Sequence, residues 1–184
     1  MAYNMKDVFY LDTALDTGTS SGTGAATLAL SSYVDPIARG RSKGTGLAIY
    51  KVHFDICDDD GNRPVAAATT GQFRAALMSL SGIPAAAVGS TITFNDDTMN
   101  ASNDLVIAGV DYAAGGTAAG DPAPHVWCEP STEVPYVVVR DQIILGLQTM
   151  TAMSVGSSVK VRMECAQVTL DQATLNQLLR TQTV

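Results

Sequence analysis

The sequence predicts an all-β sandwich, and three observations lead to this fold class. Short runs rich in Val, Ile, Leu and Thr recur along the 184 residues, separated by segments rich in Gly, Ser, Asp and Pro. Several runs alternate apolar with polar residues, as a strand with one buried face does. The length suits one domain with a substantial core, and about eight or nine short strands are typical of a sandwich or a barrel.

The predicted strands are short segments spread over the whole chain. The last one is the clearest, because apolar residues from Val159 to Cys165 alternate with charged residues and so fall on opposite faces of an extended chain. The segments are residues 8–11, 26–30, 47–57, 91–94, 105–112, 125–128, 134–140, 143–150 and 159–168.

A first helix is predicted within this β-rich pattern, at residues 69–80. Gly82 and Pro84 follow it and would end it. Apolar residues at helical spacing would form one stripe along this helix. The stripe consists of Phe73, Ala76, Leu77 and Leu80.

A second helix is predicted at the C-terminus, within residues 170–184. Asp171 is its candidate N-cap, because an Asp side chain can accept a hydrogen bond from the first helical turn. A short helix needs a surface to pack on, which is either the core of its own domain or a neighbouring subunit. The candidate contact residues are the apolar seam of Leu175, Leu178 and Leu179.

A single domain is expected to span residues 1–184, with residues 1–24 as a candidate N-terminal arm. Residues 17–24 and 113–120 are uncharged, rich in small side chains and typical of loops. No segment approaches the roughly 20 apolar residues of a membrane span. The first residues also lack the basic start and apolar stretch of a signal peptide, so a soluble chain that is not secreted by the usual route is expected.

The charge of the chain argues against one class of function. The net charge is -7 and the pI is about 4.5, with 15 Asp and 3 Glu against 7 Arg and 4 Lys. Specific or general nucleic-acid binding is not expected, because phosphate binding draws its affinity from clustered Lys and Arg. An Asp-rich, Lys-poor surface is compatible with high salt, where screening weakens the repulsion between like charges.

The segment HFDICDDDGNRPV, residues 53–65, concentrates carboxylates and raises the question of calcium binding. A calcium loop has oxygen ligands at alternate positions before a glycine and a Glu that closes the site. With Gly61 as that glycine, the first ligand position falls on Ile56 and the last on Ala67, so the pattern fails. The segment is predicted to be the tip of a hairpin. Only weak cation binding is left for Asp58, Asp59 and Asp60.

A local basic patch interrupts the acidic chain at Arg39, Arg41 and Lys43. A phosphate-binding P-loop has Gly-Lys followed by Ser or Thr between a strand and a helix. Here Lys43 precedes Gly44 and a strand is predicted to follow, so the order is wrong. The patch is either a solvated loop or a contact for an acidic partner surface or for lipid phosphates.

The sequence offers little material for a catalytic or metal centre. Its two histidines, His53 and His125, are far apart in sequence, and a nucleophile needs a base within hydrogen-bond reach. The three cysteines are widely spaced without a close pair, so free buried thiols are predicted rather than a zinc cluster or disulfides. Three carboxylates lie in one polar loop, and their spacing neither supports nor excludes a glycosidase-type catalytic pair. They are Asp96, Asp97 and Asp104. Neither an enzyme activity nor a cofactor is expected.

Two stretches of the sequence resemble a known family. The segment ATLALSSYVDP at residues 26–36 runs through the basic patch into GLAIYKVHFDI at residues 46–56. Together they resemble the opening of single jelly-roll major capsid proteins of icosahedral viruses. The length and the Asp-rich composition are similar to those of the smaller of the two major capsid proteins in membrane-containing viruses of halophilic archaea.

The resemblance implies a single jelly-roll domain that serves as a structural virion protein. In that family such subunits associate with copies of themselves, and with a second capsid protein, into capsomers of an icosahedral shell over an internal membrane. The resemblance also implies synthesis in the host cytoplasm and a final location in the virion. The basic patch would then face acidic neighbours or lipid headgroups.

Two other classes of function remain as alternatives. A calcium- or carbohydrate-binding β-sandwich would use the acidic segment as a calcium loop and three aromatic residues as a stacking platform, namely Trp127, Tyr112 and Tyr136. A jelly-roll enzyme of the cupin kind would need a cluster of metal-binding histidines, and two distant histidines supply this poorly.

Overall fold

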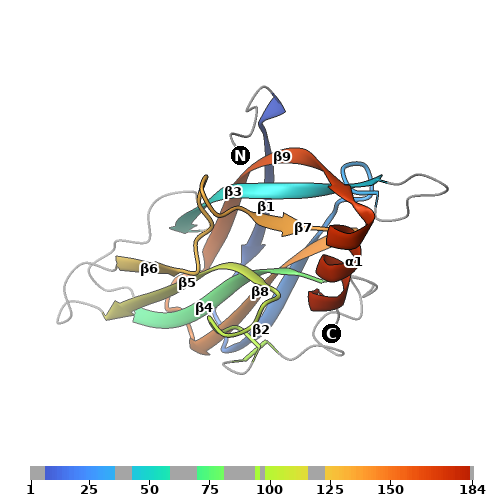
Figure 1. The fold of residues 1–184 in the computed structure, drawn as a ribbon. Coiled ribbons are helices and arrows are strands. Elements are labelled where there is room, and N and C mark those ends of the chain that lie inside the picture. The colour runs from blue at the N-terminus through green and yellow to red at the C-terminus, as the bar shows by residue number, and fades with distance from the viewer. Residues whose placement is uncertain are drawn as a thin grey trace.

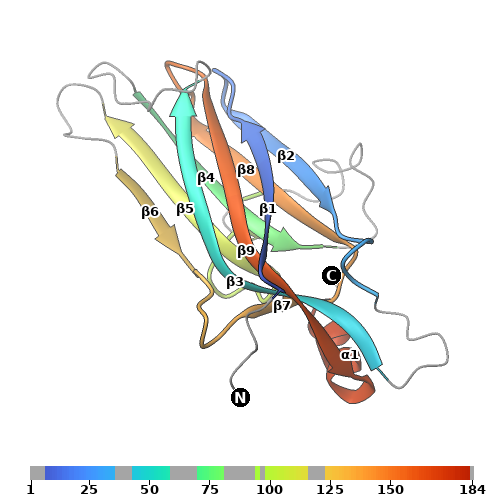
Figure 2. The same cartoon turned by 90° about the horizontal axis from the view of Figure 1, so that it is seen from above.

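Two antiparallel β-sheets pack face to face in the computed structural model, and one helix follows the last strand (Figure 1, Figure 2). The structure describes residues 7–35, 43–58, 70–80, 94–95, 98–115 and 123–182. The elements in chain order are β1 (Phe9–Asp16), β2 (Gly22–Ala29), β3 (Lys43–Asp58), β4 (Thr70–Ser79), β5 (Val106–Gly115), β6 (Ala123–Trp127), β7 (Tyr136–Val138), β8 (Gln142–Thr151), β9 (Ser157–Asp171) and α1 (Gln172–Thr181).

The order of the strands is that of a jelly roll. The first sheet has the order β1-β9-β3-β7, and the second has the order β2-β8-β4-β5-β6. Without the short edge strand β6 each sheet has four strands, and β1 to β4 alternate between the sheets as the Greek keys of a jelly roll do. The predicted all-β, jelly-roll sandwich is therefore confirmed.

The main core lies between the sheets and follows from the alternation in the strands. In β9, Val159 and Met163 are 0% exposed, whereas Lys160 and Arg162 point to solvent. Cys165 continues the buried face, and its burial raises the pKa of the thiol to about 12. The two predicted faces of this strand are confirmed.

The segment predicted to be the first helix is the strand β4, so that prediction is wrong. β4 is the central strand of the second sheet and pairs with β8 and β5. Both of its faces are buried, with Phe73 and Leu77 in the main core and Ala76 in a second cluster on the other side. A strand buried on both faces is a continuous apolar run, which periodicity does not distinguish from a buried helix.

The second apolar cluster covers the outer face of the second sheet. Phe94 and Met99, from the connection between β4 and β5, are 0% exposed within it. Two glycines make room for aromatic rings there: a Cβ on Gly146 would lie 2.2 Å from the Phe94 ring, and a Cβ on Gly109 would lie 2.2 Å from the Trp127 ring. The strand predicted at residues 91–94 lies mostly outside the described residues, and Phe94 itself is not in a strand.

The predicted hairpin after β3 is also wrong. β3 belongs to the first sheet and β4 to the second, so the chain crosses between the sheets there instead of turning back on itself. Alternation identifies a strand from its own residues but does not identify the strand it pairs with. Asp58 ends β3 in a half-buried position, and Asp59 and Asp60 lie outside the described residues.

The candidate N-terminal arm is part of the sandwich from Phe9 onward. β1 pairs with β9 along its whole length, and β2 pairs with β8. The arm prediction is therefore wrong for these residues. β1 is hard to recognise from sequence because Tyr10, Asp12 and Asp16 face solvent and leave only a weak apolar pattern. Residues 1–6 lie outside the described residues.

The C-terminal helix is confirmed as α1. Asp171 Oδ1 accepts a hydrogen bond of 2.7 Å from the Thr174 backbone N–H, and this bond lowers the pKa of the Asp171 carboxyl. Among the described residues, no helix has the length and apolar character that crossing a membrane requires.

Candidate functional site

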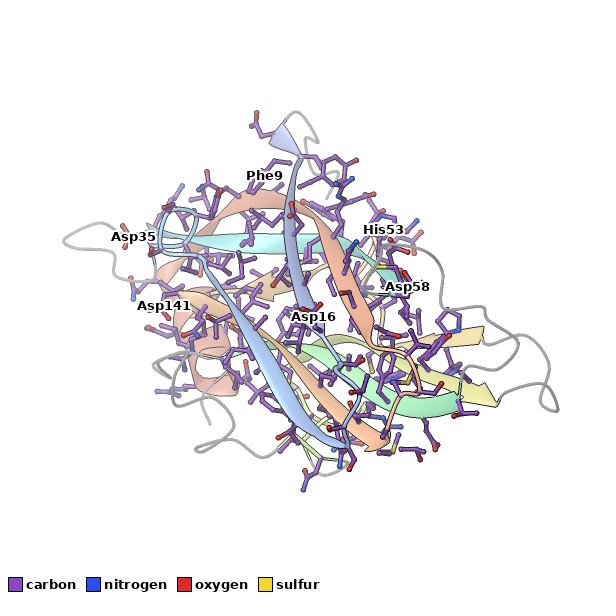
Figure 3. The ribbon with its side chains drawn as sticks, turned by 180° about the vertical axis from the view of Figure 1, so that it is seen from behind. Phe9, Asp16, Asp35, His53, Asp58 and Asp141 are labelled. Carbon is purple, nitrogen blue, oxygen red and sulfur yellow. The ribbon has the colours of Figure 1, made fainter. Side chains whose placement is uncertain are left out.

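A groove of about 740 Å³ crosses the outer face of the first sheet, over β1, β9 and β3. It forms there because the polar residues of these three adjacent strands all point to the same side of the sheet. Figure 3 marks His53, which belongs to its lining, in β3. The ionisable residues that line the groove are Asp12, His53, Asp55, Lys160, Arg162 and Glu164.

The strand register brings opposite charges together across this groove. Arg162 in β9 is the cross-strand neighbour of both Asp12 in β1 and His53 in β3. Lys160 is the cross-strand neighbour of Asp55. Opposite charges in facing positions of an antiparallel sheet attract each other, so the register itself stabilises this arrangement.

Two further contacts order the side chains of the groove. His53 Nε2 lies 2.9 Å from Glu164 Oε1, and the two side chains are 45% and 32% exposed. The Arg162 guanidinium lies over the Tyr10 ring, 5.7 Å from its centroid. Because both signs of charge are interspersed, the groove is suited to contact with another polar protein surface rather than to capture of a strongly charged small ligand.

A second site lies at the end of the chain, where Gln182 anchors α1 to both sheets. Its Oε1 accepts hydrogen bonds of 3.2 Å from the Ser79 hydroxyl at the end of β4 and from the Val139 backbone N–H after β7. Its Nε2 donates to the Val137 carbonyl in β7 at 2.6 Å. The residue is 4% exposed. A buried amide with three partners holds the helix in one position.

Arg140 completes this junction from the connection between β7 and β8. Its guanidinium donates to the Gln182 carbonyl and to the Leu179 carbonyl, both at 2.9 Å. These bonds satisfy carbonyls that a helix leaves free at its C-terminus, and the positive charge complements the helix dipole. The junction therefore fixes α1 relative to β7 and β8.

A third polar cluster ties together the strands β4, β5 and β6 on the outer face of the second sheet. Arg74 donates to both carboxylate oxygens of its cross-strand neighbour Asp111, at 2.6 and 3.1 Å. The same guanidinium lies over the Trp127 ring, 5.5 Å from its centroid. His125 Nδ1 is 4.0 Å from Asp111, and its side chain is 77% exposed. Because Arg74 engages the Asp111 carboxylate on both oxygens, this cluster serves structure rather than acid-base chemistry.

The predicted contact residues of the C-terminal helix divide into two groups. Leu175 is 0% exposed and packs within the chain itself, against Gly44 in β3. Leu178 and Leu179 are half-buried. Packing on the helix's own domain thus accounts for Leu175, and a subunit contact through Leu178 and Leu179 stays a prediction.

The predicted basic patch and the weak cation candidates lie mostly outside the described residues. Lys43 is exposed at the start of β3, where its cross-strand neighbour is Asp171. Arg39 and Arg41 are not among the described residues. Within the part of the chain that is described, no three His, Cys, Asp or Glu side chains come together as a metal site would require.

The aromatic platform of the ligand-binding alternative is not formed. Tyr112 is 4% exposed and stacks on Phe73 between the sheets. Trp127 lies on the outer face of the second sheet. The Tyr136 hydroxyl donates a hydrogen bond of 2.7 Å to the Asp104 carbonyl. The three rings face different surroundings, so they offer no common stacking surface.

The cysteines follow the prediction in two cases out of three. Cys57 and Cys165 are buried, whereas Cys128 is exposed. Cys128 has a backbone φ of 55° directly after β6, and its Sγ lies 4.0 Å from the Ala101 carbonyl. The prediction is wrong for Cys128 because the strand ends before it, so the alternation of the strand does not extend to its side chain.

Sequence reasoning missed the residues that fix α1. Gln182 and Arg140 carry no local motif, and their partners are 39 to 103 residues away in sequence. The only local signal is the position of Gln182 directly after the helix, where free carbonyls need partners.

Comparison with known proteins identifies similar solved structures but no family. No family model and no curated protein matches the chain. VP1 of trichodysplasia spinulosa-associated polyomavirus, in complex with sialylated precision glycooligomers, is 9% identical with a TM-score of 0.45, over 93% of this chain and 97% of that chain. VP1 of human polyomavirus 12, in complex with 3'-sialyllactosamine, is 7% identical with a TM-score of 0.43, over 90% and 100%. VP1 of New Jersey polyomavirus, without ligand, is 4% identical with a TM-score of 0.41, over 90% and 100%. The jelly-roll fold of this chain is therefore assigned from its own strand order.

Proposed function

We propose that this chain is a structural subunit of an icosahedral virus capsid, which assembles with copies of itself into capsomers. The observation that carries the proposal is the jelly-roll order of the two sheets. Capsid subunits share this architecture with lectins and cupins, so the side chains have to separate the three classes.

The positions of the histidines argue against a cupin-type enzyme. Such a site needs several histidines that converge on one metal ion. His53 lies in β3 of the first sheet and His125 in β6 of the second, and both are exposed. With these two residues on different sheets, a non-enzymatic role is the better supported one.

The positions of the aromatic residues argue against a carbohydrate-binding module. Tyr112 is in the core, and Trp127 is half-buried under the Arg74 guanidinium. Tyr10 is 58% exposed at the groove, but it lies beside Arg162, and the groove lining includes no second Phe, Tyr or Trp. Sugar stacking therefore has little support among the described residues.

The exposed surfaces fit a subunit that contacts neighbours on several sides. The groove face presents interspersed charges, and α1 presents Leu178 and Leu179 beside a rigid junction. We assign these two leucines to a subunit contact, because apolar residues held by a fixed helix suit a protein interface. This apolar patch need not be large, since a shell combines many contacts per subunit.

The finer features of the proposal concern partners other than identical copies. The basic patch of Arg39, Arg41 and Lys43 would contact an acidic neighbour, such as a second capsid protein, or the headgroups of an internal membrane. Replacing all three by Glu should then abolish co-assembly or binding to anionic vesicles, whereas Lys51→Glu, an exposed site in β3, should change neither. Unchanged binding by the triple variant would remove the patch from the proposal.

The experiment that tests the subunit role is negative-stain electron microscopy of purified protein combined with one pair of variants. Wild type should form discrete capsomers. Leu178→Glu should prevent them, and Gln177→Glu, which adds the same charge at an exposed neighbouring position, should not. Capsomers that form equally well with Leu178→Glu would exclude this contact.

A further inference from the structure

The four edges of the two sheets differ in a way that bears on assembly. A sheet edge presents unpaired backbone N–H and C=O groups, and proteins usually protect it with charges, prolines or short strands. The edges here are β1 and β7 in the first sheet, and β2 and β6 in the second.

Three of these edges carry such protection. β1 presents the exposed carboxylates of Asp12 and Asp16. β7 is three residues long and follows Pro135. β6 contains Pro124, which has no N–H to offer to another strand. Pairing with a further strand is therefore disfavoured at all three.

The edge of β2 carries none of these protections. Its eight residues, GTGAATLA, include no charge and no proline. β1 and β2 are close at their connecting loop and diverge from it, as Figure 2 and Figure 3 show, so β1 does not run along this edge. Among the described residues, only β8 provides backbone partners for β2.

The strand register identifies which backbone groups of β2 point outward. The Leu30 N–H donates to the Asp141 carbonyl at 2.7 Å, and the same register continues through β2 and β8. In an antiparallel ladder, hydrogen-bonded pairs alternate with pairs that are not bonded to each other. The even-numbered residues of β2 therefore bond to β8. The residues whose N–H and C=O point away from it are Thr23, Ala25, Thr27 and Ala29.

We propose that two copies of this chain pair along β2, antiparallel, and so extend the second sheet across a two-fold axis. This inference rests on the proposed self-assembly and names the edge that mediates it. Ala25 would face Thr27 of the partner subunit, and Thr23 would face Ala29 of the partner subunit. An antiparallel strand pair is self-complementary, so one edge serves both copies.

Charge selects β2 rather than β1 as the edge for a second copy. Each chain carries a net charge of -7, so two copies repel each other at long range. Pairing along β1 would add the carboxylates of Asp12 and Asp16 from both copies to the contact. Pairing along β2 adds no charge, and the main-chain hydrogen bonds supply the attraction.

A pair of proline substitutions at the two edges tests the inference. Thr27→Pro removes one outward N–H of β2 without removing a bond to β8. Ala14→Pro is the matched control, because the Thr17 N–H donates to the Ser157 carbonyl at 2.7 Å and the even-numbered residues of β1 therefore point outward. In sedimentation velocity, Ala14→Pro should associate like wild type, and Thr27→Pro should associate at least about tenfold more weakly.

The outcomes separate this inference from the proposed function. If the wild type assembles and a folded Thr27→Pro variant assembles equally well, the inference of pairing along β2 is overturned but the proposed function is not. Wild type that stops at a dimer, which Thr27→Pro abolishes, supports the pairing and contradicts capsomer assembly. Wild type that stays monomeric at every concentration overturns both.

Hydrogen exchange on wild type provides a test that does not depend on a variant that folds. The amides of Thr23, Ala25, Thr27 and Ala29 should exchange rapidly in dilute protein and become protected at concentrations where it associates. The outward amides of β1 should stay fast in both conditions. Equal exchange of the β2 amides in dilute and associated protein overturns the inference.

Discussion

Gln182 and Ser79 are 103 residues apart in sequence, yet the Ser79 hydroxyl donates a 3.2 Å hydrogen bond to the Gln182 side chain. This bond joins the end of the chain to the end of the central strand β4. The same amide also binds the backbone on both sides of the β7 end. Gln182 at the end of the C-terminal helix thus hydrogen-bonds residues of both sheets.

Gln182→Ala should destabilise the fold by about 3 kcal/mol, because it removes the hydrogen bond from the Ser79 hydroxyl and the side-chain partner of two backbone groups in a buried place. Urea denaturation followed by circular dichroism measures the change. Gln177→Ala is the control, since it removes the same amide from an exposed position of α1 and should change the free energy of unfolding little. Equal losses in the two variants would contradict the role given to Gln182.

Gly109→Ala should destabilise the protein by about 1–3 kcal/mol, because the new methyl group would overlap the Trp127 ring. Trp127 is the single tryptophan of the chain, so its displacement should also shift the emission of native protein. Gly24→Ala is the matched control, since its nearest neighbour, Leu15, is at an ordinary 3.7 Å. An unshifted emission in Gly109→Ala would show that the ring does not cover Gly109.

One thiol of three should react in native protein. At pH 8 a disulfide reagent such as DTNB should modify exposed Cys128 rapidly, and Cys57 and Cys165 only after unfolding. Burial raises the pKa of Cys165 to about 12, so its thiolate is scarce at this pH even apart from access. Cys128→Ser should abolish the fast phase. A fast phase that persists in that variant would place another thiol at the surface.

The start of α1 should weaken in acid. The hydrogen bond from Thr174 lowers the pKa of Asp171 below its ordinary value of 3.8 in the folded protein. A lowered folded pKa contributes stability that is present above pH 3.8 and is lost as the pH falls through the lowered value. Asp171→Asn, which keeps a cap without a charge, should remove this part of the pH dependence and lower Tm less than Asp171→Ala does at pH 7. Thermal denaturation between pH 2 and 7 compares the three proteins; identical pH profiles would contradict the assignment.

The elements that could be predicted from sequence are those whose structure is specified by the pattern of their own residues. β9 separates its apolar and charged residues, and α1 starts at an Asp that caps it, so both follow from local pattern. β4 was not predictable in this way. Its second buried face is covered by Phe94 and Met99, which come later in the sequence. The residues of β4 alone therefore do not indicate what buries this face.

The candidate sites show the same division. The charged face of β9 was predictable from its own residues, whereas that of β1 was not, and the assembly of the groove over β1, β9 and β3 depends on register. The unprotected edge of β2 becomes visible only with the strand order, because a neutral strand is unremarkable until it is known to lie at an edge. Gln182 acts through partners that only the tertiary structure brings to it.

The proposed capsid role requires that this jelly roll associates with itself. The most direct measurement is the mass distribution of the purified protein by light scattering, over a wide range of protein and salt concentrations. We expect discrete oligomers that grow with protein concentration and are favoured by salt, because screening weakens the repulsion between chains of net charge -7. A folded protein that remains strictly monomeric under every condition would contradict it.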